Sequence, residues 1–343
     1  MWSDVTLPTV STAVVLASDR SARATSFGFP SGPLVPVANK PVLFHALESL
    51  RAGGVRRVCL VVGGRTREEV ASAVGDGRRF DLAVERIEAV DGMSLSGALE
   101  AAAGFLSDEP FLVHDGEAMV GEDIGALGSR FAASDLDALA LTLWPNGRSD
   151  DRRRSSHRRE LRAIGACFLS PSSTYESEQG SLEISPLLAG LRQSGARVGL
   201  ERVEGCLPCQ SGEALLSANR RALERLRPEP IGAELVDSVV DGPVVIHRTA
   251  RLRRTLVRGP AVIGPRTILS HAYIGPYTSV GADVVVEGAE AEYSVILDGA
   301  RLQSLGNRLE SSIVGRNARI TRDFRVPQAI RVVVADWAEI SLA

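Results

Sequence analysis

Lysine is almost absent from the chain, since Lys40 is the only lysine among 39 basic residues. Cysteines number four, aromatic residues make up 5%, and the formal net charge is −3 over 343 residues. Four cysteines are too few to cross-link a chain of this length, so free thiols are expected. The weak net charge argues against nucleic acid or a membrane surface as the main partner. Any mechanism that needs a particular lysine must use Lys40.

Long apolar runs are also absent. No stretch reaches the ~18–20 residues of a transmembrane helix, and no basic segment followed by an apolar run opens the chain. A cytoplasmic protein without a membrane partner is therefore expected. Hydrophobic residues make up 44% of the chain and charged residues 24%, which allows a large core and suits two domains.

The first part of the sequence alternates between strand and helix patterns. Residues 14–17 and 58–62 are short apolar runs of the kind that buried parallel strands show. Between them, Pro41 can open a helix. We expect further helices over residues 67–74, 95–106 and 215–226, and strands over 82–87, 111–114, 138–143 and 163–169. The alternation predicts a Rossmann-like, mostly parallel sheet that ends near the linker prolines Pro228 and Pro230.

From residue 236 onward a six-residue pattern recurs. Each copy begins with an aliphatic residue followed by Gly or Asp, and one such hexad per strand is the period of a parallel β-helix. Unrelated short strands would leave the repeat unexplained. The copies are IGPRTI (263–268), IGPYTS (274–279), VGADVV (280–285), LDGARL (297–302) and VGRNAR (314–319).

Several segments carry a family resemblance. They are LVPVANKP (34–41), DEPFLVHDGE (108–117), GSLEI (180–184), ALLSANRRAL (214–223) and VDSVVDG (236–242). With the hexads, they resemble the sugar nucleotidyltransferases, most closely the long-form glucose-1-phosphate thymidylyltransferases. The resemblance implies a nucleotidyltransferase-like α/β domain over residues 1–230 and a left-handed parallel β-helix over 231–343. It also implies transfer of a nucleotide to a sugar 1-phosphate, with Mg²⁺ as the cofactor if the protein is active; no other cofactor is expected.

The phosphate loop that the resemblance places after the first strand has lost its glycines. The family has a Gly-Gly pair and then Gly-Thr-Arg, whereas residues 18–23 read SDRSAR and match only at Arg23. Side chains at the glycine positions crowd a triphosphate, and the carboxylate of Asp19 repels it. The family's lysine falls on Gly32. The remaining candidate ligand contacts here are Ser18, Asp19 and Arg20, and Arg23 is a candidate catalytic residue.

The metal positions are altered as well. Glu117 stands where the family has the aspartate of Leu-Gly-Asp, and Asp115 is a second candidate ligand for the cation. The other metal-binding aspartate falls on Pro208, whose side chain cannot bind an ion. Asp115 and Glu117 are therefore the candidate metal ligands and, with Arg23, the candidate catalytic residues. His114 either contacts the ligand in acid–base chemistry or is a structural residue.

Sugar and base recognition depart further from the family. Its pyrimidine-reading glutamine aligns near Ala89, and only Gly165 and Glu183 carry over as sugar-side ligand contacts. The Glu-Lys-Pro segment is replaced by an arginine-rich stretch over residues 148–162, which is either a phosphate clamp or a solvated loop. Cys206 and Cys209 form a Cys-x-x-Cys pair, which is either a metal or redox site or two small buried residues.

The residues that specify the fold are thus kept, and those that specify the reaction are not. We predict a pseudoenzyme that acts as a regulatory or partner subunit, with a nucleotide or nucleotide sugar as its candidate ligand. A homo-oligomer, or a hetero-oligomer with a paralogue, is expected. The alternative is an active or repurposed enzyme acting on nucleotide sugars in a specialised-sugar or secondary-metabolite pathway, so the question of catalysis stays open.

Overall fold

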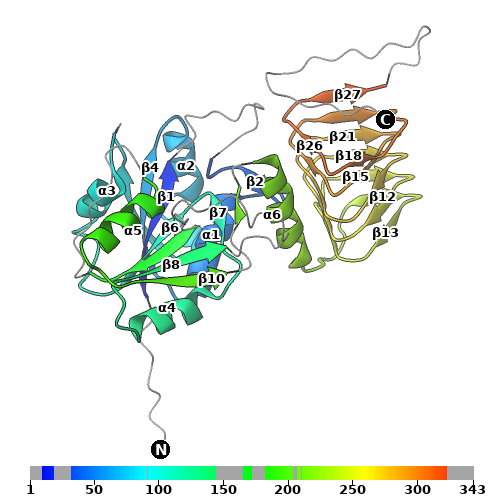
Figure 1. Ribbon diagram of the computed structural model, residues 1–343. Helices are drawn as coiled ribbons and strands as arrows, with labels where there is room; N and C mark the ends of the chain where they lie inside the picture. The colour runs from blue at the N-terminus through cyan, green and yellow to red at the C-terminus, as the bar shows by residue number, and fades with distance from the viewer. Residues whose placement is uncertain are drawn as a thin grey trace, which may run out of the picture. The chain divides into compact units, whose positions relative to one another are not determined.

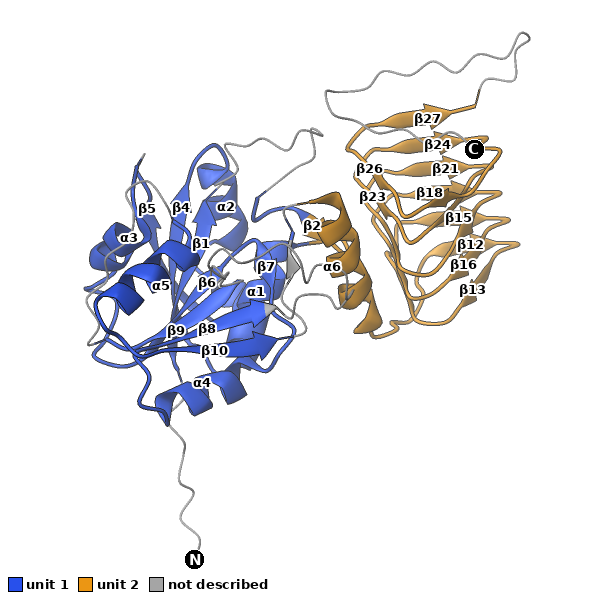
Figure 2. Ribbon diagram, in the orientation of Figure 1, with its two compact units in different colours: residues 1–23, 31–35, 41–209 blue, residues 24–30, 36–40, 210–343 orange. Residues whose placement is uncertain are grey.

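The structure is a computed structural model and describes residues 10–18, 32–90, 92–143, 165–171, 182–203, 207–209 and 211–322. The described residues gather into two compact units (Figures 1 and 2). Unit 1 contains the described residues up to Cys209, except Pro36–Lys40. Unit 2 contains Pro36–Lys40 and the described residues from 211 onward. None of the helices in these ranges is both long and apolar enough to cross a membrane.

Unit 1 is built on a seven-stranded sheet with the order β10-β8-β9-β6-β1-β4-β5. Neighbouring strands are parallel except at β9, which is antiparallel to β6 and to β8. The central strands are almost wholly buried, as expected where helices cover both faces. The strands are β1 (Thr12–Ser18), β4 (Arg57–Gly63), β5 (Ala83–Glu88), β6 (Phe111–Asp115), β8 (Ala138–Leu143), β9 (Ala166–Leu169) and β10 (Val198–Val203).

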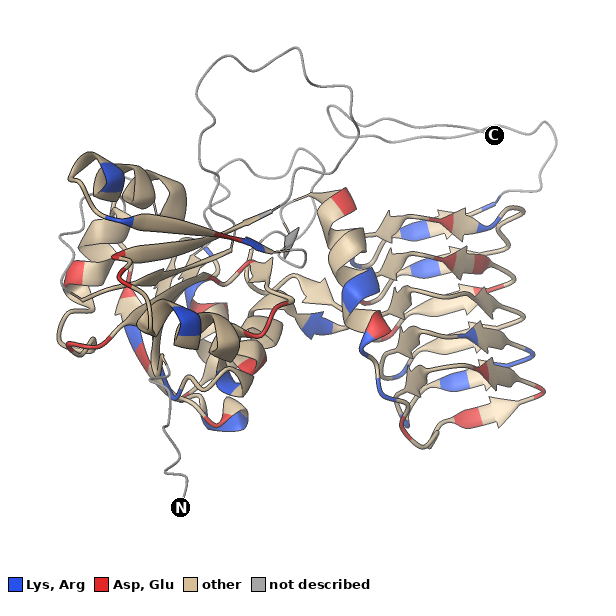
Figure 3. Cartoon of the chain, turned by 60° about the horizontal axis from the view of Figure 1, so that its bottom comes forward, with Lys and Arg blue, Asp and Glu red and all other residues tan. Residues whose placement is uncertain are grey.

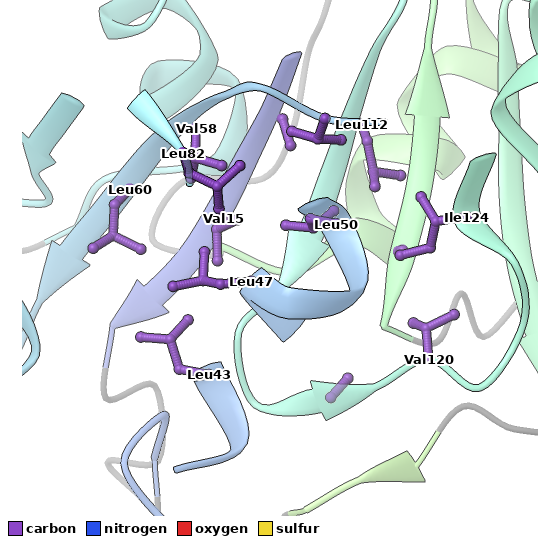
Figure 4. Packing of buried hydrophobic residues seen from close by; sticks show 14 of the residues in the cluster. Val15, Leu43, Leu47, Leu50, Val58, Leu60, Leu82, Leu112, Val120 and Ile124 are labelled. Atoms are coloured by element: carbon purple, nitrogen blue, oxygen red, sulfur yellow. The ribbon is translucent and has the colours of Figure 1, made fainter. Parts of the chain in front are cut away.

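Helices cover both faces of this sheet. One core cluster packs α1 (Val42–Ala52), α2 (Arg67–Val74) and α4 (Ile124–Ala132) against one face. A second packs α3 (Leu95–Ala101) and α5 (Ile184–Gln193) against the other. Figure 4 shows the first cluster, in which Leu43 and Leu47 of α1 lie beside Val15 of β1. Short elements complete the unit: the 3₁₀ helix η1 (Arg78–Phe80), β7 (Ala118–Met119) and β11 (Leu207–Pro208).

The predicted α/β architecture is confirmed, although α4, α5 and β10 were not predicted and two predicted helices have different bounds. The helix expected over residues 95–106 ends at Ala101, and Arg57 holds the following turn. The Arg57 guanidinium donates to the carbonyl of Phe105 at 2.9 Å and stacks 4.3 Å from the centre of its ring. The helix expected over 215–226 is α6 (Gly212–Glu224), which starts earlier because the Ser211 hydroxyl accepts a hydrogen bond from the Ala214 amide.

Unit 2 is a left-handed parallel β-helix, as the hexads and the family resemblance predicted, and its strands stack into three parallel sheets. Pairing joins Glu234 with Arg251 and Arg251 with Ile268, so the first coils have 17 residues each, and later coils have between 16 and 18 residues. In the first sheet the middle residue of β15 and of β18 points inward, so that Leu252 and Leu269 belong to one buried column. In the third sheet the inward residues are instead those on either side of the middle one, such as Val244 and Ile246 of β14. Each hexad therefore buries its aliphatic residue by stacking on its neighbours. The outward positions carry charges of both signs (Figure 3).

The strands of the three sheets follow one another around the coil. The first sheet holds β12 (Glu234–Val236), β15 (Arg251–Arg253), β18 (Ile268–Ser270), β21 (Val285–Glu287), β24 (Arg301–Gln303) and β27 (Arg319–Thr321). The second holds β13 (Val239–Asp241), β16 (Leu256–Arg258), β19 (Tyr273–Ile274), β22 (Glu290–Glu292) and β25 (Leu309–Glu310). The third holds β14 (Val244–Ile246), β17 (Ala261–Ile263), β20 (Thr278–Val280), β23 (Val295–Ile296) and β26 (Ile313–Val314).

Left-handed residues turn the corners between the sheets. Asp237, Arg254 and His271 occupy one corner in successive coils, with φ of 49°, 47° and 49°. The Arg254 guanidinium lies 3.3 Å from the His271 ring and 3.9 Å from the Asp237 carboxylate. Exposed contacts of this kind contribute at most about 1 kcal/mol each. His271 therefore has a structural place on the coil.

A β-hairpin from the first part of the chain belongs to unit 2. It consists of β2 (Pro36–Val37) and β3 (Lys40–Pro41), joined by Ala38 and Asn39, which both have positive φ as a type I′ turn requires. Asn219 of α6 is 1% exposed; its side-chain oxygen accepts from the Ala38 amide at 2.9 Å, and its amide donates to the Tyr277 carbonyl at 3.2 Å. The Asn39 side chain donates to the Val280 carbonyl at 2.6 Å. These bonds fasten the hairpin to α6 and to the coil.

The grouping of α6 with the coil differs from the sequence-based division of the chain. The sequence placed this helix before a boundary at residue 230, whereas in the structure it packs within unit 2. Residues 1–230 and 231–343 remain a prediction of which segments fold as independent domains.

Substitution of Asn219 tests how the hairpin is held. We expect Asn219→Ala to lower the free energy of unfolding by about 2–3 kcal/mol, because the Ala38 amide and the Tyr277 carbonyl lose a buried partner. Chemical unfolding of the full chain, followed by circular dichroism, measures this loss. Ser217→Ala, a partly exposed change on the same helix, is the control and should stay within about 0.5 kcal/mol. Equal stability of the two variants would contradict the role assigned to Asn219.

Candidate functional site

The candidate site lies where β1 and β6, neighbours in the middle of the sheet, reach their carboxyl ends. Leu16 pairs with Asp115, and β6 is buried along its whole length. Open α/β sheets bind ligands in the crevice beyond the carboxyl ends of their strands. The turn after β6 places Glu117 at this edge together with Asp115, and both are nearly buried, with exposures of 3% and 8%.

Backbone hydrogen bonds fix the turn that carries these two carboxylates. The Asp115 amide donates to the Gly165 carbonyl at 2.7 Å, and the Gly116 amide donates to the Leu16 carbonyl at 2.9 Å. A side chain at Gly116 would put its Cβ 2.8 Å from the Leu16 oxygen, so this position needs glycine. Asp115 Oδ1 accepts from the Glu117 amide at 3.0 Å. One oxygen of Asp115 is therefore used to hold the turn.

Gly32, at the position of the family's lysine, lies beside Glu117. An ideal Cβ at Gly32 would be 4.0 Å from Glu117 Oε1, so there is room for a side chain. The φ of Gly32 is +104°, a backbone conformation that residues with a side chain rarely adopt. A lysine at this position, where the resemblance puts one, would therefore meet a backbone conformation that disfavours a side chain.

A short strand pair completes the other side of the turn. Leu207 and Pro208 form β11 and pair antiparallel with Met119 and Ala118 of β7. The next residue, Cys209, donates its amide to the Glu117 carbonyl at 3.0 Å. Pro208 is therefore part of a paired backbone at the place where the resemblance puts a metal-binding aspartate.

Cys209 is a buried, protonated thiol. Burial raises its pKa to about 12, and the negative charges of Glu117 and Asp115 add to the rise. A thiol becomes a good metal ligand or nucleophile only as the thiolate, which this environment opposes. Cys206 lies outside the described residues, so the metal or redox alternative for the Cys-x-x-Cys pair stays a prediction. Sequence reasoning did not place Cys209 beside the two carboxylates, because two-residue strands leave no periodic signal.

The donor set fits a Mg²⁺ site poorly. Within the described ranges, no group of three or more His, Cys, Asp or Glu side chains could hold a metal ion. Asp115 uses Oδ1 for the Glu117 amide, and proline stands at the second aspartate position. Mg²⁺ demands near-octahedral oxygen donors, so a site with these protein ligands would depend heavily on water and on phosphate oxygens from a ligand.

His114 is fully buried in β6, on the face of the sheet opposite to that of Asp115. Burial lowers its pKa to about 4, opposed by the nearby charge and backbone of Asp115. Among the described residues, neither ring nitrogen has a hydrogen-bond partner. The ring is therefore neutral at pH 7, and its place inside the core favours the structural alternative over acid–base chemistry.

Three other predicted ligand contacts lie within the described residues. Ser18 ends β1 opposite Gly63 and is 5% exposed, and its hydroxyl has no hydrogen-bond partner there. Gly165 precedes β9 with φ of 75° and accepts the bond from Asp115. Glu183 is exposed and stands at the N-cap of α5 without a side-chain capping bond. The structure thus brings Ser18, Asp115 and Gly165 to neighbouring strand ends and assigns Glu183 to a helix terminus.

The remaining candidates cannot be placed. Asp19, Arg20 and Arg23 lie outside the described residues, as does the arginine-rich stretch over residues 148–162. Their assigned roles stay predictions.

The pH dependence of stability tests the burial of His114. Its pKa is lower in the folded chain than the usual 6.5, so the unfolded chain takes up a proton that the folded chain excludes, and stability falls as the pH drops from about 6.5 towards 4. We expect His114→Leu to remove about 2 kcal/mol of the difference in unfolding free energy between pH 7.5 and pH 5. Urea unfolding at both pH values measures this difference in free energy. The exposed His247 is the control; if His247→Gln and His114→Leu changed the difference equally, the assignment would fail.

Comparisons with known proteins agree with this geometry. A nucleotidyl transferase family model matches residues 30–153. The chain is 33% identical to a glucose-1-phosphate thymidylyltransferase of Streptomyces griseus, over 96% of this chain and 99% of that protein. It is 30% identical to a low-salt glycan biosynthesis nucleotidyltransferase, Agl11, of Haloferax volcanii, over 91% of this chain and 95% of that protein.

A solved structure supports the fold alone. A Bacillus anthracis protein, described as a glucose-1-phosphate thymidylyltransferase in complex with sucrose, superimposes with a TM-score of 0.50 at 17% identity. The match covers 62% of this chain and 95% of that one. Identities of 30–33% over more than nine-tenths of the chain show that this chain belongs to the sugar nucleotidyltransferase family. The sheet agrees with this, because it brings two buried carboxylates to its carboxyl edge.

Proposed function

We propose that the protein is a non-catalytic member of its family that acts as a regulatory or partner subunit. The observation that carries this proposal is the backbone around Glu117. Gly32, which lies beside the Glu117 carboxylate, has a positive φ, and Pro208 belongs to β11, which pairs with β7. The family uses a lysine and an aspartate at these two positions. Both losses are held in place by main-chain geometry, so a rotation of nearby side chains does not compensate for them.

The energetic consequence is large because phosphoryl transfer depends on charge neutralisation. Removal of one preorganised donor costs about 3 kcal/mol of transition-state stabilisation, which is a factor of about 10² in rate. The chain lacks the lysine, the second metal aspartate and the glycine-rich turn of the phosphate loop. Such groups act as a unit, so their combined loss removes ordinary turnover rather than slowing it slightly.

A partner role suits what is retained. Both compact units keep complete cores, and relatives match the chain from end to end. A chain that keeps its folding determinants but not its catalytic groups is suited to binding, either to an active paralogue or to a nucleotide or nucleotide-sugar ligand.

One observation favours the alternative of a repurposed enzyme acting on nucleotide sugars. Asp115 Oδ1 accepts a hydrogen bond from the Glu117 amide at 3.0 Å. Both carboxylates are nearly buried at the edge where open α/β sheets bind ligands. In this alternative the two acids, with Arg20 and Arg23, act on a substrate that does not need the second metal ligand.

Calorimetric titration of the full chain separates these candidates. We expect no binding of dTTP or UTP that depends on Mg²⁺, and no release of pyrophosphate when glucose 1-phosphate is added. The Streptomyces griseus relative serves as the positive control under the same conditions. Micromolar, Mg²⁺-dependent binding of a nucleoside triphosphate would rule out the non-catalytic proposal. Absence of binding to dTTP, UTP and dTDP-glucose by the folded chain would rule out a nucleotidyltransferase acting on these substrates.

Restoration of the phosphate loop tests the weight given to Pro208. We expect a variant carrying Ser18→Gly, Asp19→Gly, Ser21→Gly and Gly32→Lys to remain without turnover, because the second metal ligand is still missing. Turnover by this variant would contradict the proposal.

The backbone cost of the restored lysine is tested separately. We expect Gly32→Lys to destabilise the fold by about 1–2 kcal/mol, since its φ of +104° disfavours a side chain. Gly92 also has a positive φ, of +80°, and a Cβ there would meet nothing within 4 Å, so Gly92→Lys is the matched control. Thermal unfolding compares the two; a loss at Gly32 but not at Gly92 would show that crowding rather than backbone conformation is responsible.

A further inference from the structure

β5 is the outermost strand of the unit 1 sheet, and among the described residues no strand pairs with its free edge (Figure 2). Natural edges are commonly blocked by charged side chains, proline, a bulge or short length, because an open edge is a template for another strand. This edge is six residues long, contains no proline, carries charges of both signs at Glu85, Arg86 and Glu88, and leads to Val90. Val90 is 67% exposed, the highest value among the large hydrophobic residues that the structure describes as exposed.

The backbone groups that face the free edge follow from the pairing with β4. The amides of Ala83 and Ala89 donate to carbonyls on the β4 side, at 2.9 and 2.8 Å. In a parallel pair, alternate residues point both their N–H and C=O groups towards one neighbour. The odd-numbered residues therefore bond to β4, and the even-numbered ones face outward. Those facing outward are Val84, Arg86, Glu88 and Val90.

The side chains of the same residues share one face of the sheet. Val84 packs against the core cluster that contains α2. Arg86 donates to the Gly75 carbonyl just after α2, at 2.5 Å, and Glu88 lies 3.1 Å from Arg67 of that helix. Side chains alternate between the faces of a strand, so Ile87 points to the other face.

These two alternations limit how a second copy could add to the edge. A two-fold axis perpendicular to the sheet pairs β5 antiparallel with its copy and keeps each face continuous across the pair. Outward-facing residues must then lie opposite outward-facing residues. Centring the pair on Glu85, Arg86 or Glu88 sets that residue opposite itself and places like charges together, which is destabilising. Centring it on Ile87 avoids this.

The register centred on Ile87 is complementary in charge and in apolar contact. It sets Arg86 opposite Glu88 of the other copy, and the symmetry repeats this pair. It also sets Val84 opposite the exposed Val90. The four outward-facing residues of each strand exchange about eight hydrogen bonds in such a pairing.

We propose that β5 is a self-complementary docking edge through which two copies of this chain pair antiparallel about Ile87, forming one continuous sheet. The contact is small compared with the ~1,200 Å² or more that stable interfaces bury, so the dimer dissociates on dilution. The pairing involves unit 1 alone and does not depend on whether the protein is catalytic.

Charge exchange across the edge tests the register. Sedimentation velocity of the full chain over a range of concentrations should show a reversible assembly. Arg86→Glu and Glu88→Arg should each weaken it by about tenfold or more, because two attractive pairs become repulsive. The double variant restores opposite charges and should return to within about threefold of the original chain. Arg86 and Glu88 are both exposed, so the two single variants and the double variant are expected to fold.

A distant charge change and hydrogen exchange provide the controls. Arg130 is exposed on α4 and pairs with Glu201 of β10, the strand at the opposite end of the sheet, so Arg130→Glu should leave the assembly unchanged. In the assembled protein the amides of residues 84, 86, 88 and 90 should gain protection from hydrogen exchange as concentration rises. A wild-type chain that stays monomeric, an assembly unaffected by either single substitution, or a double variant that fails to recover would each overturn the proposal.

Discussion

The hydrogen bond from the Gly116 amide to the Leu16 carbonyl determines how the central strands of unit 1 end. At 2.9 Å it draws the turn after β6 over β1, where a side chain would collide with the Leu16 oxygen. Because the turn is held there, Asp115 and Glu117 stay at the carboxyl edge with little exposure to water. The same turn supplies the Glu117 carbonyl to the Cys209 amide. The turn at the candidate site is therefore held mainly by main-chain bonds, to which the Asp115 side chain adds one.

Because of this separation between scaffold and chemistry, the fold does not depend on the residues that a nucleotidyl transfer would need. The scaffold depends on buried apolar residues and on main-chain bonds, and a phosphate loop adds little to either. Gly32 and Pro208 illustrate the difference. Each is compatible with the local backbone, one through a left-handed φ and the other through a place in β11. Neither supplies a charge, so folding stability alone does not oppose these two residues.

The sequence predicted those elements whose burial leaves a local pattern. β1 and β4 are continuous apolar runs because helices cover both of their faces, and the coil repeats its aliphatic residue at a fixed interval. α4 was not predicted, since Gly125 and Gly128 weaken its helical pattern; Gly125 lies against the Gly53 carbonyl and has no room for a larger residue. The place of Cys209 and the bonds of Asn219 depend on residues far away in the sequence, which no local pattern records.

The hairpin at residues 36–41 has a consequence for how the chain is made. Its Asn39 side chain bonds to Val280, 241 positions later, and its Ala38 amide bonds to Asn219, 181 positions later. A ribosome releases the hairpin long before it has synthesised either partner. Domains usually fold in order from the N-terminus during synthesis. Here a segment near the start of the chain takes its final place only after the third coil has been synthesised, so the order of synthesis and the order of assembly differ for this hairpin.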